Sequence, residues 1–202
     1  MMRNLTTLVL IGLLAACKPA ADSAPAEKEP AALPVPEARA DGPAAATTAI
    51  SLDGEGLRFV DKANGKTSLL AFGVPRVQAE EALGRVMGKE SDRSSNAECG
   101  AGPMDFTRYD AMTLNFQDGK FAGWFLGNEP GAENYSTMSG IAVGTPRAKA
   151  AASVKLIAIE DSTLGEEFSL GEGEKAIGGM FAAPGDDAKI DALFAGVNCF
   201  FR

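Results

Sequence analysis

The chain has 202 residues and a formal net charge of −8, with 19 basic and 27 acidic side chains. This acidic balance repels phosphate backbones and anionic headgroups, so no nucleic-acid partner is expected. Histidine is absent, which excludes Ser-His-Asp and Cys-His catalysis and removes the commonest metal ligand, so neither a metal nor a cofactor is expected.

Residues 1–16 have the parts of an export signal. Arg3 supplies a positive charge, residues 5–14 form an apolar run, and two alanines precede Cys17. The apolar run is shorter than the ~20 residues that cross a bilayer, and an ordinary export signal needs no cysteine. The sequence LAAC at residues 14–17 resembles the lipobox of bacterial lipoproteins. The resemblance implies cleavage before Cys17.

In bacterial lipoproteins the cysteine thiol receives a diacylglyceryl group, and the new amino terminus is often acylated. For Cys17 the resemblance therefore implies an anchor in the cell envelope. Two or three acyl chains, at about 0.8 kcal/mol per buried methylene, hold a protein stably on a membrane. Lys18 rather than Asp follows the cysteine. By analogy with enterobacterial sorting, this favours the outer membrane facing the periplasm, with the inner membrane as the alternative.

The stretch after the cysteine is composed mainly of Ala and Pro and shows no apolar periodicity. This composition predicts a disordered, semi-stiff tether over residues 17–49. At about 3.1 Å per residue it could reach at most ~100 Å from the bilayer. The remaining part, residues 50–202, is long enough to bury a substantial core.

An internal repeat organises residues 50–202. FGVPR at residues 72–76 matches VGTPR at residues 143–147, and residues 117–124 are echoed at residues 186–193. Apolar residues at helical spacing predict a helix after the first copy, with Pro75 at its first position and Gly88 at its end. After the second copy, an alanine-rich stretch predicts a shorter helix with Thr145 as its N-cap.

Strands are predicted around the helices. Asp118-Gly119 lies between MTLNF and KFAGWFL, which predicts a hairpin with a type I′ turn. Further β runs are GLRFV, EEFSL, AIGGMF and IDALFAGVNCFF, whose glycines favour bulges. The pattern predicts an α+β fold of two repeated units, about residues 50–135 and 136–202. Each unit would pack a short helix on a twisted antiparallel sheet.

Two cysteines remain once Cys17 carries lipid. Cys99 and Cys199 form an even pair in an oxidising compartment, which predicts a structural disulfide. Closing a loop of this length would contribute about 4–5 kcal/mol on the chain-entropy model. A redox-active pair is the alternative, although the C-x-x-C spacing is missing.

The run of Gly-x-Pro-Arg, helix, glycine and hairpin over residues 69–88 resembles the tandem α/β repeats of periplasmic lipoproteins of the SmpA/OmlA and β-lactamase-inhibitor-like group. Residues 140–155 resemble it less closely. This chain departs from the group's G-x-[ST]-x-x-x-[VA] helix start, because Pro75 and Pro146 stand two residues after the glycine. Members bind proteins or serve in envelope assembly, so the resemblance implies a non-catalytic binding module with a protein or envelope partner.

Acidic pairs are the candidate groups for chemistry. They are Glu80-Glu81, Glu98 with Asp105, Glu166-Glu167, Glu172 with Glu174, and Asp186-Asp187. Two carboxylates in a cleft would suit an envelope glycan hydrolase. Positions in a helix start and in turns favour solvated surface instead. A carrier of a small ligand is a third alternative, and it would need an apolar pocket between the helices and the sheet.

The densest aromatic group is a candidate interface. Strict strand alternation places Trp124 on one face, and Phe121 and Phe125 on the other. Burial in the core is the commoner fate of such a strand, whereas exposure of one face would suit an interface. Phe200 and Phe201 leave the same two alternatives open.

Overall fold

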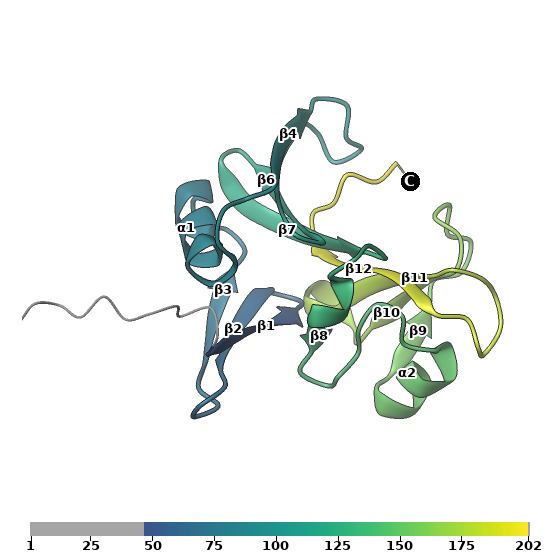
Figure 1. Ribbon diagram of the computed structural model, residues 1–202. Coiled ribbons are helices and arrows are strands. Elements are labelled where there is room, and N and C mark those ends of the chain that lie inside the picture. Colours follow the sequence, from purple (N-terminus) through teal and green to yellow (C-terminus); the bar gives the residue numbers. More distant parts are fainter. Residues whose placement is uncertain (1–46, 202) are drawn as a thin grey trace, which may run out of the picture. The chain divides into compact units, whose positions relative to one another are not determined.

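The computed structural model describes residues 47–201 (Figure 1). The predicted signal, Cys17 and nearly all of the predicted tether lie outside these described residues. The predicted boundary between tether and domain at residue 50 lies slightly too late. Strand β1 (Thr48–Asp53) begins before it, and Thr48 and Ala49 already pair with the neighbouring strand. Main-chain pairing already includes Thr47, whose carbonyl accepts a hydrogen bond from the Lys62 N–H.

The described residues mix helix with strand and are mostly sheet, as the predicted α+β class requires. After β1 the elements are β2 (Gly56–Asp61), β3 (Thr67–Ala71), α1 (Arg76–Met87), β4 (Asp92–Asn96), β5 (Met104–Tyr109), β6 (Met112–Gln117), β7 (Lys120–Gly127), the 3-10 turn η2 (Ala132–Asn134), β8 (Ser136–Thr137), α2 (Arg147–Ser153), β9 (Leu156–Ala158), β10 (Glu167–Leu170), the 3-10 turn η3 (Gly173–Lys175), β11 (Ile177–Phe181) and β12 (Ile190–Gly196).

The strands form two sheets. The larger has the order β4-β5-β6-β7-β12-β11-β10-β9, and all its pairs are antiparallel. Two four-stranded meanders therefore meet at the pair β7–β12, where Phe125 stands opposite Phe194. The smaller sheet has the order β3-β2-β1-β8, and its short strand β8 runs parallel to β1.

The two Gly-x-Pro-Arg segments make the same main-chain contacts. In each, a glycine with positive φ precedes the proline, and the proline forms an isolated β-bridge with the lysine that begins or precedes the last strand of its meander. The bonds of the first segment are Gly73 N–H to Phe121 O, Phe121 N–H to Val74 O and Arg76 N–H to Gly119 O; those of the second are Gly144 N–H to Ile190 O, Ile190 N–H to Thr145 O and Arg147 N–H to Ala188 O.

This bridging changes how the helices begin. Pro75 and Pro146 are the N-cap residues, with extended ψ angles of 143° and 144°, and the helices start at Arg76 and Arg147. The predicted N1 position of Pro75 and the predicted N-cap role of Thr145 are both wrong, because each proline is drawn into the bridge as an extended residue. Gly88 does end α1, with a φ of 82°.

The hairpin β6–β7 has the predicted type I′ turn, since Asp118 and Gly119 have φ angles of 51° and 71°. A bulge lies just beyond it: Phe116 stands opposite Phe121, and Asn115 stands opposite Gly123. The extra residue reverses the alternation, so Phe121 faces the same side as Trp124. Strict alternation is therefore the wrong prediction for this strand. The pair β11–β12 has the same irregularity, between Met180 and Phe181.

The core lies between the two sheets and beneath α1. Trp124, Phe121 and Leu83 are among its fully buried members, and the Trp124 indole N–H donates a 3.0 Å hydrogen bond to the Asp53 carbonyl of the smaller sheet. Trp124 and Phe121 thus hold the sheets together. The prediction that Trp124 and Phe121 belong to an interface is therefore wrong, because both are buried in the core. Phe125 is half-buried and lies on the opposite face of the larger sheet.

Candidate functional site

An aromatic face covers the side of the larger sheet that points away from the core. Along β5, β6, β7 and β12 the residues that alternate with core residues are paired across the strands: Phe106 with Asn115, Thr113 with Phe125, and Phe125 with Phe194. We call Phe106, Thr113, Asn115, Phe125 and Phe194 the aromatic face. Phe125, the third residue of the predicted interface, belongs to it.

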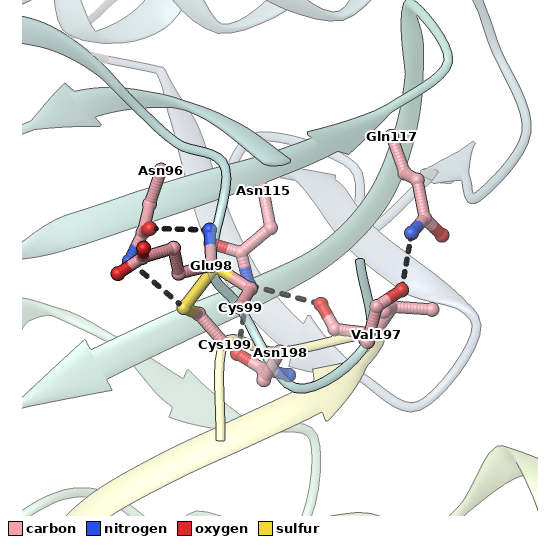
Figure 2. Close-up of a disulfide and its surroundings, with 9 residues drawn as sticks. Asn96, Glu98, Cys99, Asn115, Gln117, Val197, Asn198 and Cys199 are labelled. Atoms are coloured by element: carbon pink, nitrogen blue, oxygen red, sulfur yellow. Dashed lines mark hydrogen bonds between the residues drawn. A yellow bond between two sulfur atoms is a disulfide. The ribbon is translucent and has the colours of Figure 1, made fainter. Parts of the chain in front are cut away.

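The chain after β12 turns onto this face (Figure 2). The Val197 N–H donates to the Ala122 carbonyl at 2.9 Å. The Asn115 side-chain amide donates to the Val197 carbonyl at 3.0 Å and to the Asn198 side-chain oxygen at 2.7 Å. Asn198 in turn donates to the Ala195 carbonyl at 3.1 Å. A buried amide in the middle of a strand therefore directs the C-terminal segment across the sheet.

A disulfide then ties this segment to the loop between β4 and β5. The sulfur atoms of Cys99 and Cys199 lie 2.08 Å apart, and the Asn96 side-chain amide lies 3.6 Å from the Cys199 sulfur (Figure 2). Cys199 follows β12 rather than lying within it, where the predicted strand had placed it. The loop fits tightly against the segment, since a Cβ at Gly100 would stand 2.1 Å from the Phe200 oxygen.

Phe200 covers the centre of the aromatic face. Its ring centroid lies 4.8 Å from that of Phe194 and 6.2 Å from that of Phe125, both edge-on. Phe200 and Phe106 line a hollow of about 240 Å³, and Phe200 and Phe201 line another of about 400 Å³. Phe201 is 65% exposed. Of the two alternatives, Phe200 packs on the sheet and Phe201 points to solvent.

The two hollows beside Phe200 have an apolar and uncharged polar lining. Among the described residues, their lining consists of aromatic, aliphatic, amide and hydroxyl groups with the disulfide, and none of these residues carries an ionisable side chain. Such a surface offers apolar contact and amide hydrogen bonds. The sequence analysis did not single out Phe106, Thr113 or Asn115. The signal that could have indicated them is the lone Asn inside the apolar run MTLNF.

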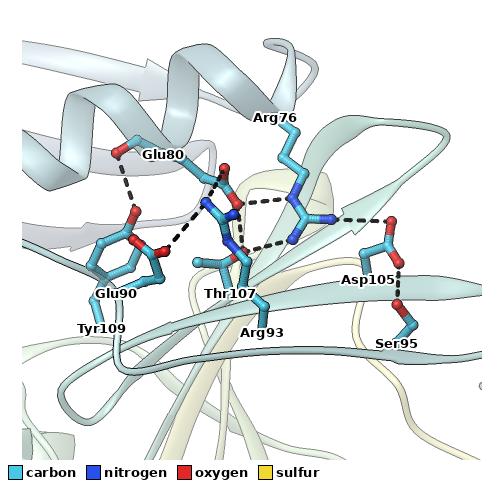
Figure 3. A network of polar contacts seen from close by, with 8 residues as sticks. All are labelled: Arg76, Glu80, Glu90, Arg93, Ser95, Asp105, Thr107 and Tyr109. Atoms are coloured by element: carbon cyan, nitrogen blue, oxygen red, sulfur yellow. Dashed lines mark hydrogen bonds and ion pairs between the residues drawn. The ribbon is translucent and has the colours of Figure 1, made fainter.

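A second polar cluster surrounds Arg76 at the start of α1 (Figure 3). The Arg76 guanidinium donates hydrogen bonds to Glu80 at 2.8 Å and to Thr107 at 3.0 Å, and it forms an ion pair with Asp105 at 3.2 Å. It also lies 4.9 Å from the centroid of the Phe116 ring. We call these residues the Arg76 cluster. Every polar group of the cluster faces a partner, so it ties α1 to β5 and β6.

Glu80 is the central acceptor of the Arg76 cluster. It receives a 2.7 Å hydrogen bond from Thr107 and a 2.9 Å ion pair from Arg93 of β4 (Figure 3). Burial raises the pKa of Glu80, but the hydrogen bonds from Thr107 and Arg76 and the charges of Arg76 and Arg93 outweigh it, so the pKa falls below its usual 4.5. A carboxyl held ionised in this way is unsuited to act as a general acid.

Arg147 occupies the matching place at the start of α2. Its guanidinium lies 4.0 Å from the Phe181 ring centroid and 2.6 Å from Glu166. The position four residues on is Ala151, where the first copy has Glu80. Among the described residues the Arg147 Nε is buried without a hydrogen-bond partner. The second copy keeps the arginine–phenylalanine contact and lacks the carboxylate that faces Nε in the first.

The other acidic pairs are dispersed. Glu81, Glu98, Glu174, Asp186 and Asp187 are exposed. Glu167 is buried and accepts a hydrogen bond from Ser162, and Glu172 pairs with Lys155. Asp105 shares a hollow of about 260 Å³ with Asp118, but Arg76 and Ser95 hold its carboxylate.

Within residues 47–201 no group of three or more His, Cys, Asp or Glu residues is placed to hold a metal ion. No helix in this described part is both long and apolar enough to span a bilayer. Comparisons with known protein families, curated proteins and solved structures find no match for this chain.

Proposed function

We propose that this protein is a lipid-anchored envelope protein, cleaved before Cys17, acylated there and held on the periplasmic side of the outer membrane. The observation that carries the proposal is the order of Arg3, the apolar run over residues 5–14, two alanines and Cys17. A chain of this kind carries its membrane attachment in the lipid.

The test of the anchor is Cys17→Ser in the full chain. This variant should move from the membrane fraction to the soluble fraction, while Cys99 and Cys199 and the fold they serve stay as they are. Labelling with a radioactive fatty acid should mark the native protein and leave Cys17→Ser unmarked. An unchanged membrane fraction in the variant would refute the lipid anchor.

We further propose that the domain consists of two repeated units, each with one helix and four strands. The two Gly-x-Pro-Arg segments support this, since they bond to equivalent strands through equivalent atoms. The register of β7 and β12 also supports it. An offset of 69 residues relates Leu126 to Ala195 and Trp124 to Leu193, so the pair Leu126–Leu193 corresponds to the pair Trp124–Ala195. The pair Phe125–Phe194 lies at the centre and corresponds to itself. The strands β1, β2, β3 and β8 would be additions outside the repeat.

We propose that the domain binds a protein of the envelope through the aromatic face and the adjoining Phe201. The half-buried rings of Phe106, Phe125 and Phe200 beside two hollows support this role, because aromatic side chains dominate the energetics of interfaces. The resemblance of residues 69–88 to repeats of protein-binding lipoproteins agrees with it.

A photo-crosslinking amino acid at position 201 tests the binding face in living cells. The matched control carries the same amino acid at Lys66, an exposed position in the turn between β2 and β3. A partner of the face should give one discrete adduct from position 201 and none from position 66, and Phe106→Ala should weaken that adduct. Equal adducts from both positions, or none together with glycan-hydrolysing activity, would refute the binding role in favour of the hydrolase alternative.

A further inference from the structure

We propose that the domain has a second binding site, a hollow beside the end of α1 that takes a small zwitterion with an apolar body, the chemistry of an apolar amino acid or a short apolar peptide. The hollow has a volume of about 490 Å³, larger than either hollow beside Phe200. It shares no lining residue with the aromatic face. The site therefore goes beyond the proposed function and is tested without it.

Five parts of the chain build the hollow. They are the start of β1, the residue after β2, the last residues of α1, the turn between β5 and β6, and the end of η2 with the residue after it. Ile50, Val86 and Met87 supply apolar wall, and Lys62 and Asp110 supply one charge of each sign. Sites for small ligands have volumes of roughly 300–1,000 Å³ and combine apolar walls with a few polar groups. The hollow has both properties.

Lys62 supplies the positive charge. Its main-chain N–H donates to the Thr47 carbonyl at 2.8 Å, which holds the residue beside β1. The carboxylate next to it in the chain, that of Asp61, accepts hydrogen bonds from the Ala63 N–H and from the Asn64 side-chain amide, both at 2.8 Å. Among the described residues no carboxylate forms an ion pair with the Lys62 ammonium. This ammonium can therefore face the carboxylate of a ligand.

Asp110 supplies the negative charge. It lies in the turn between β5 and β6 with a φ of 54°, and its carboxylate lies against the start of η2, since a Cβ at Gly131 would stand 2.3 Å from the Asp110 Oδ2. Arg108, two residues earlier, donates to the Asp110 carbonyl and pairs its charge with Glu129. Within residues 47–201 no cation forms an ion pair with the Asp110 carboxylate. This carboxylate can therefore face the ammonium of a ligand.

Tyr135 adds a buried hydroxyl group to the same wall. The residue is 5% exposed, and its hydroxyl donates to the Met87 sulfur at 3.8 Å. A thioether is a weak acceptor, and in the described part of the chain this sulfur is the acceptor that the hydroxyl has. Burial and the charge of Asp110 raise the pKa of Tyr135 to about 12, so the hydroxyl keeps its proton at neutral pH. A ligand oxygen would give this buried donor a stronger acceptor.

These groups define the ligand by complementarity. A carboxylate would face Lys62, an ammonium would face Asp110, and an oxygen would accept a hydrogen bond from Tyr135. The apolar body of the ligand would lie on Ile50 and Val86. Amino acids and short peptides carry these two opposite charges at their ends and have an apolar body when their side chains are apolar. A ligand with a single charge would leave one of the two charged side chains without a partner.

Titration of the full chain carrying Cys17→Ser with leucine and with leucyl-leucine tests the site, with the backbone amides followed by two-dimensional NMR. At least one of the two ligands should saturate the protein with a Kd tighter than about 1 mM. It should shift the amide signals of Lys62, Met87 and Asp110. N-acetyl-leucine amide lacks both charges and should bind about tenfold more weakly. Whichever of the two zwitterions binds more tightly gives the length of ligand that the site takes.

Three variants connect the binding to its proposed groups. Asp110→Asn removes one charge and keeps a residue type that accepts the positive φ of this turn, and Lys62→Gln removes the other. Each should raise the Kd by about three- to fivefold. Tyr135→Phe keeps the buried ring and should raise the Kd by about fivefold. The matched control is Lys66→Gln, exposed in the same turn as Lys62 and outside the lining of the hollow, and it should leave the Kd unchanged.

Four results would overturn the site. They are no saturation by either zwitterion, equal affinity for N-acetyl-leucine amide, an equal loss of affinity in Lys66→Gln, and amide shifts confined to the aromatic face. The circular dichroism of each variant shows whether its fold is intact. All of these measurements use the purified protein. Missing adducts from position 201 therefore count against the binding role of the aromatic face alone, and missing saturation counts against the hollow alone.

Discussion

Arg76 and Arg147 begin two helices in the same way and have different surroundings. Each follows a Gly-x-Pro sequence and lies over a phenylalanine. Arg76 also has Glu80, Thr107 and Asp105 around its guanidinium, whereas Arg147 has Glu166 and a buried Nε without a partner among the described residues. The two segments share an arginine that lies over an aromatic ring. The carboxylates and the hydroxyl that surround Arg76 are additions to this shared arrangement.

The largest difference should appear when each arginine is removed. Arg76→Ala removes one of the donors to Glu80 and the donor to the buried hydroxyl of Thr107, and we expect it to lower the free energy of unfolding by about 2–3 kcal/mol. Arg147→Ala loses a ring contact and a more exposed ion pair, and we expect about 1 kcal/mol. Urea unfolding measures both. Arg85→Ala, exposed near the end of α1, is the control. A cost for Arg147→Ala equal to that for Arg76→Ala would contradict the comparison.

The charge of Glu80 should make the first copy sensitive to acid. Because its folded pKa is lowered below 4.5, its stabilisation is fully present above that pH and is lost as the pH falls through the lowered value. Glu80→Gln keeps the shape and should cost about 1–2 kcal/mol at neutral pH. The difference between the two proteins, followed by unfolding at several pH values, should shrink below pH 4.5. A constant difference would mean that the charge is not what matters.

The second copy should gain from the carboxylate that it lacks. Ala151→Glu places one at the position that Glu80 has in the first copy, within reach of the Arg147 Nε. We expect a gain of about 0.3–0.5 kcal/mol in the free energy of unfolding. Ala152→Glu adds the same charge one residue further along α2, out of register with Arg147, and serves as the control. If both variants change stability equally, the effect is general and the missing carboxylate does not explain the orphaned Nε.

The smallest effect is spectroscopic. Burial and the charges of Glu80 and Glu90 raise the pKa of Tyr109, whose hydroxyl donates to the Glu80 carbonyl oxygen. Burial, with the charge of Asp110, raises the pKa of Tyr135 to about 12. In a titration of tyrosinate absorbance, Glu80→Gln should lower the pKa of Tyr109 and leave that of Tyr135. Arg147→Ala should move neither. An equal shift of both tyrosines would indicate a general loosening of the fold.

Local sequence signals were sufficient where one short-range interaction decides the conformation. The Asp118-Gly119 turn and the end of α1 at Gly88 followed from residues that accept positive φ. The offset of the two Gly-x-Pro-Arg segments pointed to equivalent places in the larger sheet. The pairing of Cys99 with Cys199 followed from counting cysteines, although where Cys199 sits did not.

Other features depended on partners far along the chain. The bulge after Asp118-Gly119 is set by the pairing of β6 with β7, and it moved Phe121 to the face of Trp124 against simple alternation. The cap role of Pro75 depends on its bridge to Lys120. Phe106 and Asn115 became part of a site only because the segment at Val197 crosses them, 82 positions beyond Asn115.

The sequence by itself determined the acidic, histidine-free composition, the presence of the two helices and the hairpin turn. These follow from composition and from interactions within a few residues. Export and anchoring stay predictions from the same sequence. The tertiary structure decided which face of the larger sheet is core and which carries the aromatic face. It also decided that, among the described residues, each guanidinium nitrogen of Arg76 has a partner whereas the Arg147 Nε has none. Those outcomes depend on strand register and on contacts between distant residues, which no local pattern encodes.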